Sequence, residues 1–280
     1  MTVLGSGTSH GVPAIGCDCA VCRSSDPRDR RTRPSILIEV QPGSNLSPLN
    51  EPAASPPIAA AADSPISAAA RSILVDTSTD LRYQALTNNI RRVDTILFTH
   101  AHADHIFGLD DVRRFNAIQR TPIGCYGGAE TLDSLRRMFA YMFSPTAQIG
   151  GGIPQLLLFQ IAGPFSMGGV DIVPVPLLHG RLPVLGFRLG PFAYLTDCNR
   201  IPDESWPLLN GVHTVILDAL RHRPHSTHFT VNEALDVVAR LGAKRAYFTH
   251  ICHDLPHAQT CRELPAGVEL AYDGLVVEIA

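Results

Sequence analysis

Metal-binding side chains are concentrated in one short stretch of the chain, residues 97–105. The apolar segment that ends at Phe98 is followed by three imidazoles and one carboxylate, on His100, His102, Asp104 and His105. Imidazole and carboxylate groups are typical ligands of zinc and related transition metals. His100 and His102 are two residues apart, so both side chains point the same way in an extended segment. Because one ion rarely takes four ligands from so short a loop, the pattern predicts two adjacent cations.

A second cluster of candidate ligands lies near the N-terminus, where Cys17, Cys19 and Cys22 fall within six residues. Three thiolates can supply three ligands of a tetrahedral zinc site. The fourth ligand must come from elsewhere in the chain, and histidine is the expected type. Spacing alone leaves three free buried cysteines as the alternative. A closed four-ligand site would be structural, because it leaves no open position for catalysis.

Strand-like segments precede the other candidate ligands. Apolar runs at 93–99, 170–175, 192–197 and 246–249 predict strands. His179 and His250 follow two of these segments, and Asp197 ends a third. Helices are expected over about 80–88, from 108 onward, over 130–143 and over 230–241. Ligand groups at the ends of four strands indicate an α/β scaffold that gathers one site along one edge.

The remaining pattern also favours an α/β chain. Further strands are predicted at residues 1–4, 35–40, 72–76, 122–126, 156–159, 186–189 and 215–218, and residues 268–279 predict two strands joined by a tight Asp273-Gly274 turn. Asp76 ends a strand, where it could orient the metal loop or belong to the start of the next helix. Residues 41–70 are rich in proline, alanine and serine, which predicts a low-complexity insertion within one domain spanning 1–280.

Composition limits the class of protein. The 280 residues are 45% hydrophobic and carry a net charge of -3, which gives no electrostatic basis for binding nucleic acid or an anionic membrane. No apolar run is long enough to span a bilayer, and the first residues do not resemble a secretory signal. The odd number of cysteines, seven, favours reduced thiols and a cytoplasmic location. We expect a small-molecule substrate and leave a homodimer open.

With these residues in place, the sequence resembles the metallo-β-lactamase superfamily. The family motif His-x-His-x-Asp-His matches at residues 100–105, and the later histidine, aspartate and histidine match at His179, Asp197 and His250. The resemblance implies a four-layer αβ/βα sandwich with two divalent cations, zinc or manganese, in the cleft between its halves. In the family pattern one cation takes His100, His102 and His179. The other takes Asp104, His105 and His250, and Asp197 bridges the two.

A narrower resemblance is to the phosphodiesterases of the carbon–phosphorus lyase pathway. That family carries Gly-Cys-x-Cys-x-x-Cys, matched at residues 16–22, and Thr-His-Ile-x-His, matched at residues 249–253. The resemblance implies a structural zinc held by the three cysteines and His253. It also implies a general acid in the loop before the late helix, for which His228 is the best match and His225 the competitor. Residues 41–70 and the helix over 107–119 depart from that family.

The leading hypothesis is a dinuclear metal-dependent hydrolase that acts as a phosphodiesterase on a small or cyclic phosphate ester. His228 would protonate the leaving group, and Asp104 would be catalytic as well as a metal ligand. One alternative is an ester, thioester or lactone hydrolase of the same fold. Another is a non-catalytic metal-binding accessory protein. Transfer RNA processing is disfavoured, because the chain has no basic extension.

Overall fold

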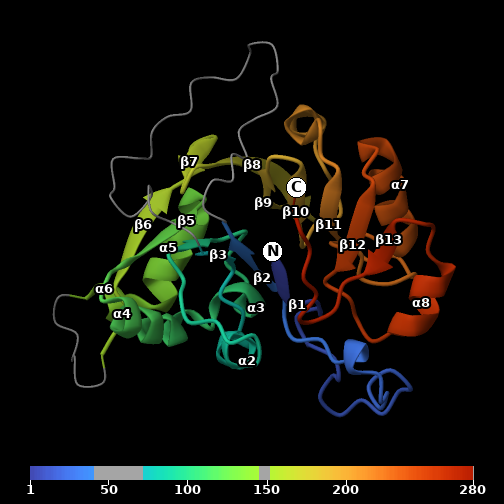
Figure 1. Ribbon diagram of the computed structural model, residues 1–280, viewed down its shortest axis with the longest axis horizontal. Coiled ribbons are helices and arrows are strands. Elements are labelled where there is room, and N and C mark those ends of the chain that lie inside the picture. The colour runs from blue at the N-terminus through green and yellow to red at the C-terminus, as the bar shows by residue number, and fades with distance from the viewer. Residues whose placement is uncertain (41–71, 145–151, 280) are drawn as a thin grey trace.

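The structure is a computed structural model that describes residues 1–40, 72–144 and 152–279. Its strands form two sheets (Figure 1). The first sheet consists, in spatial order, of β1 (Thr2–Gly5), β2 (Ser35–Glu39), β3 (Ser72–Val75), β4 (Thr95–Leu97), β5 (Ile123–Gly127) and β6 (Leu156–Gln160). The second consists of β13 (Val268–Leu270), β12 (Arg245–Thr249), β11 (Thr214–Asp218), β10 (Phe192–Leu195), β9 (Leu182–Leu189), β8 (Val170–His179) and β7 (Phe165–Met167).

Each sheet is antiparallel on one side and parallel on the other. Strands β1 to β3 pair antiparallel, whereas β3 to β6 pair parallel. In the second sheet β7 to β10 pair antiparallel and β10 to β13 pair parallel. The predicted pairing of 35–40 with 72–76 is confirmed by the register of β2 with β3. The predicted insertion that connects them, residues 41–70, lies outside the described residues.

Helices cover the outer face of each sheet. Beside the first sheet lie α2 (Leu81–Thr87), α3 (Ala103–Ile106), the 3-10 turn η2 (Leu109–Val112), α4 (Arg113–Gln119), α5 (Ala129–Met138) and α6 (Ala140–Phe143). Beside the second lie α7 (Val231–Leu241) and α8 (His257–Glu263) (Figure 1). Two further 3-10 turns are η1 (Pro27–Asp29) and η3 (Asp203–Leu209).

The core is divided into three layers, which confirms the predicted four-layer sandwich. One buried cluster joins the facing sides of both sheets, with Ile36 and Leu97 on one side and Phe187 and Ile216 on the other. A second lies between the first sheet and its helices, and a third between the second sheet and α7. Successive strand residues point to opposite faces, so β2 sends Ile36 inward and Leu37 toward the helices. Strands buried on both faces explain the continuous apolar runs in the sequence.

Helix α7 begins and ends where its sequence predicts. Thr230 and Glu233 form a capping box, because each side chain accepts a hydrogen bond from the other residue's backbone N–H. Gly242 ends the helix in a left-handed conformation with φ of 64°. The predicted helix over 80–88 is confirmed as α2. The helix expected from 108 begins as the 3-10 turn η2 and continues as α4.

Two predicted elements differ from the structure. The helix expected over 130–143 is interrupted at Phe139, which separates α5 from α6. The hairpin expected over 268–279 is wrong, because only β13 joins the second sheet. After the turn at Asp273 the chain runs beside β1, where Val3 N–H donates to the carbonyl oxygen of Leu275. Asp273 fixes this course by accepting hydrogen bonds from the backbone and hydroxyl groups of Ser6 and Thr32.

Candidate metal centre

The predicted ligands of the two cations meet at one edge of the two sheets. His100 follows β4, His179 ends β8, Asp197 follows β10 and His250 follows β12. They form two groups in which one ligand atom of each residue lies within 4.8 Å of the others: His100, His102, His179 and Asp197, and Asp104, His105, Asp197 and His250. Asp197 belongs to both groups. The structure therefore brings together all seven predicted side chains and gives Asp197 the central place.

Backbone conformation at the strand ends helps to direct these side chains. Asp76, Asp197 and His250 have φ angles of 62°, 50° and 59°. Non-glycine residues rarely adopt this left-handed region, because the Cβ atom then crowds the backbone. Asp76 and His250 directly follow β3 and β12, and Asp197 lies two residues after the end of β10. Strain of this kind persists where the surrounding structure imposes it, and functional sites are where it concentrates.

Hydrogen bonds from outside the cleft orient two of the histidines. The Nδ1 atom of His105 lies 2.7 Å from Oδ2 of Asp76, which also accepts from the Thr99 hydroxyl at 2.8 Å. The Nδ1 atom of His179 lies 2.9 Å from the carbonyl oxygen of Thr227. With Nδ1 engaged in this way, Nε2 is the nitrogen left for a ligand. Of the two roles open to Asp76, these contacts support orientation of the metal loop.

Several buried atoms in the cleft have no hydrogen-bond partner. Among them are Nε2 of His100, His105 and His250 and Oδ2 of Asp104. Asp197 lies among them, with Oδ2 3.2 Å from Nε2 of His105 and Oδ1 3.0 Å from Nε2 of His250, yet neither contact has hydrogen-bond geometry. An unpartnered buried polar atom is costly, so four around one point indicate a missing partner. Cations fit this place, since each of these four atoms is a metal-ligand type.

The charges in the cleft shift the pKa values of its histidines in opposite directions. Burial lowers the pKa of His100 well below its ordinary value, and the nearby His105 adds to this effect. Burial opposes protonation of His250 as well, but Asp197 and Asp104 outweigh it and raise its pKa to about 10. Burial acts to raise the pKa of Asp197, but His250 and His105 outweigh it and hold this pKa well below its usual range. The cleft thus concentrates negative charge that cations would neutralise.

The cysteine cluster acquires its fourth member from the far end of the chain. The Nδ1 atom of His253 lies 3.2, 3.7 and 3.4 Å from the Sγ atoms of Cys17, Cys19 and Cys22. All seven cysteines of the chain are free of disulfides. A tetrahedral zinc with ordinary bond lengths places sulfur and nitrogen ligands about 3.6 Å apart. The arrangement therefore fits one closed zinc site and favours it over three unrelated thiols.

The loop after β11 places the predicted general acid beside the cleft. His228 stacks on His250 with ring centroids 4.5 Å apart. Its Nδ1 atom lies 2.8 Å from Oδ2 of Asp218, the buried residue that ends β11. His225 is exposed, and its ring centroid lies 5.0 Å from that of His228. Sequence reasoning missed Asp218, although it shares with Asp197 the place of a carboxylate at the end of a buried strand.

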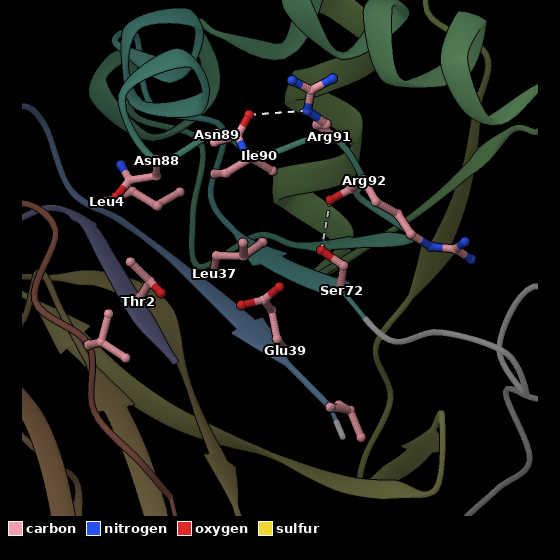
Figure 2. A pocket seen from close by; sticks show the side chains of 12 residues that line it. Thr2, Leu4, Leu37, Glu39, Ser72, Asn88, Asn89, Ile90, Arg91 and Arg92 are labelled. Atoms are coloured by element: carbon pink, nitrogen blue, oxygen red, sulfur yellow. Dashed lines mark hydrogen bonds between the residues drawn. The ribbon is translucent and has the colours of Figure 1, made fainter. Parts of the chain in front are cut away.

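A cavity of about 580 Å³ lies elsewhere in the molecule (Figure 2). It is lined by residues from β1, β2 and the loop after α2, among them Glu39, Arg91 and Arg92. Two hydrogen bonds cross its wall, from Arg91 to the Asn89 side chain and from the Ser72 hydroxyl to the carbonyl of Arg92. None of the predicted metal ligands lines it. The chemistry is therefore assigned to the cleft rather than to this cavity.

Comparison with known families identifies the fold. A family model described as the beta-lactamase superfamily domain matches residues 71–251, which is most of the chain. The chain belongs to this superfamily. The membership predicted from the His-x-His-x-Asp-His motif is confirmed, and with it the fold.

Solved structures of the superfamily resemble the whole chain. A structure described as a new diphosphatase from the PhnP family is 42% identical, covers 100% of this chain and 97% of its own, and has a TM-score of 0.83. The narrower resemblance found in the sequence points to this family. Zinc-bound PqqB from Methylobacterium extorquens is 18% identical over 99% of both chains, with a TM-score of 0.70. The short form of human tRNase Z, also 18% identical, covers 100% of this chain and 98% of its own with a TM-score of 0.60. At this identity the last two show the fold alone.

A curated relative from Porphyromonas gingivalis carries the name octanoyltransferase. It is 34% identical over 275 residues, which are 98% of this chain but 50% of that protein. The chain therefore spans half the length of the relative. Within the described residues no helix is long and apolar enough to cross a membrane. Superfamily membership, together with the metal-compatible cleft, supports a hydrolase.

Proposed function

We propose that this member of the superfamily is a dinuclear metal-dependent phosphodiesterase for small or cyclic phosphate esters. The observation that carries the proposal is the pair of four-residue groups that share Asp197 beside the His228–Asp218 pair. Similarity to a diphosphatase at 42% identity over the full chain gives additional support for phosphate ester chemistry. The same observation argues against an accessory protein without a catalytic site, because the cleft retains all the ligand types of a working centre.

Each cation is assigned three ligands of its own. One takes His100, His102 and His179, the other takes Asp104, His105 and His250, and Asp197 serves both. A third ion, a structural zinc, takes Cys17, Cys19, Cys22 and His253. Zinc and manganese are both compatible with the histidine and carboxylate ligands of the cleft. A single domain over residues 1–280, a cytoplasmic location and a homodimer stay predictions.

The proposed reaction hydrolyses one ester bond of a phosphodiester. When bound, two divalent cations would provide a water nucleophile at neutral pH and neutralise charge on the phosphate oxygens. Water loses one proton to solvent as its oxygen adds to phosphorus, the bond from phosphorus to the leaving oxygen breaks, and that oxygen takes up a proton from the general acid. His228 is placed to donate this proton from Nε2, because its Nδ1 is held by Asp218. Asp218 is thus a positioning residue for the general acid.

The test is a substrate panel with protein of defined metal content. The panel contains bis(4-nitrophenyl) phosphate, a cyclic nucleotide, a diphosphate diester, a lactone and a thioester. We expect turnover of phosphate esters and none of the lactone. An Asp197→Asn variant should lose turnover together with metal. The control is Arg240→Gln on α7, where the guanidinium lies over the ring of Trp206, and this variant should keep both.

Two results would contradict the proposal. Turnover of the lactone or thioester without any phosphate ester would establish the alternative carbonyl hydrolase. Full metal occupancy with no turnover of any substrate would favour the accessory protein.

A further inference from the structure

A groove of about 360 Å³ lies between α2 and α4, on the helical side of the first sheet (Figure 1). Its apolar lining consists of Leu81, Ala85, Leu86, Ile90, Phe115 and Ile118. Leu86 and Ile118 are 65% and 51% exposed, so both helices present apolar surface to solvent at this place. The volume falls within the range of small-ligand sites, about 300–1,000 Å³. None of the predicted metal ligands lines the groove, which separates it from the candidate metal centre.

The two walls of the groove are held close together where α2 and η2 begin. Gly108 precedes η2, and a Cβ atom there would lie 2.1 Å from the carbonyl oxygen of Ser78 and 2.7 Å from Cβ of Leu81. The N–H of Gly108 also donates to the carbonyl oxygen of Thr77 at 2.9 Å. Only glycine allows so close an approach of two segments. The groove is therefore built into the fold, as sites for small ligands usually are.

Positive charge surrounds this apolar surface, on the side chains of Arg82, Arg91 and Arg114. Among the residues that the structure describes, none of these three arginines forms an ion pair with a carboxylate. Arg91 donates to Oδ1 of Asn89 at 3.1 Å, and Figure 2 shows its guanidinium pointing away from Glu39 and the larger cavity. Asp111 is the acidic residue in the described lining. Uncompensated positive charge along a concave surface attracts anions.

The spacing of residues along each helix places charge next to apolar surface. Arg82 and Leu86 are four residues apart on α2, and Arg114 and Ile118 are four residues apart on α4. Side chains with this spacing lie on one face of a helix, one turn apart. Each wall therefore offers a guanidinium beside an apolar side chain. A ligand that satisfies both has an apolar body and an anionic head.

The size of the groove favours a small molecule over a protein partner or a membrane. Helices α2 and α4 have seven residues each, which at about 1.5 Å per residue makes a groove about 10 Å long. A stable protein interface buries about 800 Å² on each partner, far more than such a groove offers. A flat bilayer would contact the exposed Leu86 and Ile118 but could not reach Phe115, which is buried at the base.

We propose that the groove between α2 and α4 binds the anion of a medium-chain fatty acid, with about ten carbons. The alkyl chain lies against Ala85 and Ile118, and the carboxylate pairs with Arg114. A guanidinium suits this role, because its paired N–H groups match the two oxygens of a carboxylate. The inference goes beyond the proposed function and does not depend on it, since no residue of the metal centre takes part.

The test is calorimetric titration of the full metal-loaded chain with decanoate below its micelle concentration. We expect one saturable site per chain, without binding of acetate, which lacks the alkyl chain, or of decyltrimethylammonium, which carries the opposite charge. Arg114→Gln should weaken binding at least about tenfold, because charged hydrogen bonds are lost. Ile118→Ser should weaken it about tenfold through lost apolar contact. The control is Arg137→Gln on α5, outside the groove, which should bind decanoate as the native protein does.

A second variant tests the groove without changing its charge. Ala85→Trp places a large side chain in the groove and should abolish binding of decanoate while the metal content stays the same. Unchanged affinity in Arg114→Gln and Ala85→Trp, equal binding of decyltrimethylammonium, or no saturable binding of decanoate would overturn the inference. Binding to phosphatidylglycerol vesicles but not to monomeric decanoate would also overturn it, in favour of a membrane surface. Turnover of phosphodiesters tests the proposed function separately, so either conclusion can fail alone.

Discussion

At the scale of single residues, the site is defined by what lies behind each ligand. The contact of Nδ1 with Asp76 orients Nε2 of His105 toward the cleft, and the contact of Nδ1 with the carbonyl oxygen of Thr227 does the same for His179. The sequence left the orienting role of Asp76 open as one of two, whereas the carbonyl of Thr227 comes from a distant segment that spacing along the sequence could not reveal. The motif residues could be predicted because their types are concentrated in a few loops. Asp218 was missed because a lone carboxylate after a strand has no distinguishing neighbour in sequence.

The pair formed by His228 and Asp218 leads to a prediction about leaving groups. Asp218→Asn preserves shape but removes the charge that holds Nδ1 of His228. Turnover of alkyl phosphodiesters should fall about 10²-fold, because a poor leaving group needs the proton. Turnover of 4-nitrophenyl esters should fall much less, and KM should change little. Steady-state kinetics on both substrate types measures this difference.

His228→Ala should show the same selectivity for leaving groups with a larger loss. Equal losses on alkyl and aryl substrates in both variants would remove His228 and Asp218 from this role. The same selective loss in His225→Ala would transfer the role to His225.

At the scale of elements, the ends of the strands determine where the metal ligands lie. The burial of the strands on both faces determines their apolar sequences. Segments such as Ser72–Val75 are apolar on both faces because helices and the other sheet cover them. Such runs are recognisable in the sequence. The course of the chain after Asp273 could not be recognised in this way. The hydrogen bonds that fix it join residues that are 241 and 267 positions apart in the sequence. The break at Phe139 was missed for a different reason, because the apolar residues keep helical spacing across it.

The turn that carries His253 is tied to the N-terminal segment by Arg31. This buried guanidinium donates to the carbonyl oxygens of Cys252 and Leu255 at 2.9 and 2.6 Å and pairs with Asp29. These contacts hold the turn against the N-terminal segment that follows the cysteine loop, and so help to bring His253 to the three thiols.

Removing one thiol tests the structural zinc. Cys19→Ser should lose about one zinc per chain and lower the melting temperature, because metal binding stabilises the folded state. Elemental analysis and thermal unfolding measure the two effects. Cys261→Ser, which changes a thiol outside the cluster, should keep the metal. Unchanged metal content and melting temperature in Cys19→Ser would show that the thiols are free.

At the scale of the whole molecule, stability should depend on pH through His257 at the start of α8. Burial, reinforced by the charges of Arg28 and Arg31, lowers the pKa of this histidine to about 4. Asp26 and Asp29 act in the opposite direction. An unfolded histidine titrates near 6.5. Between these values the unfolded chain binds a proton that the folded chain does not, so acidification favours unfolding.

We therefore expect the free energy of unfolding to decrease as the pH falls from about 6.5 to about 4, with this histidine contributing at most about 1.4 kcal/mol per pH unit. His257→Gln should reduce that slope. Urea unfolding at several pH values measures it, and equal slopes in the two proteins would refute the assignment.

The account depends most on two cations that share Asp197 in the cleft. Anomalous diffraction from crystals of the metal-loaded protein tests this directly, with data collected at the zinc and manganese absorption edges. We predict two peaks in the cleft, one contacted by His100, His102 and His179 and one by Asp104, His105 and His250, with Asp197 between them. A third peak should lie at the cysteine cluster. A cleft that holds one cation or none, after loading with either metal, would contradict the account.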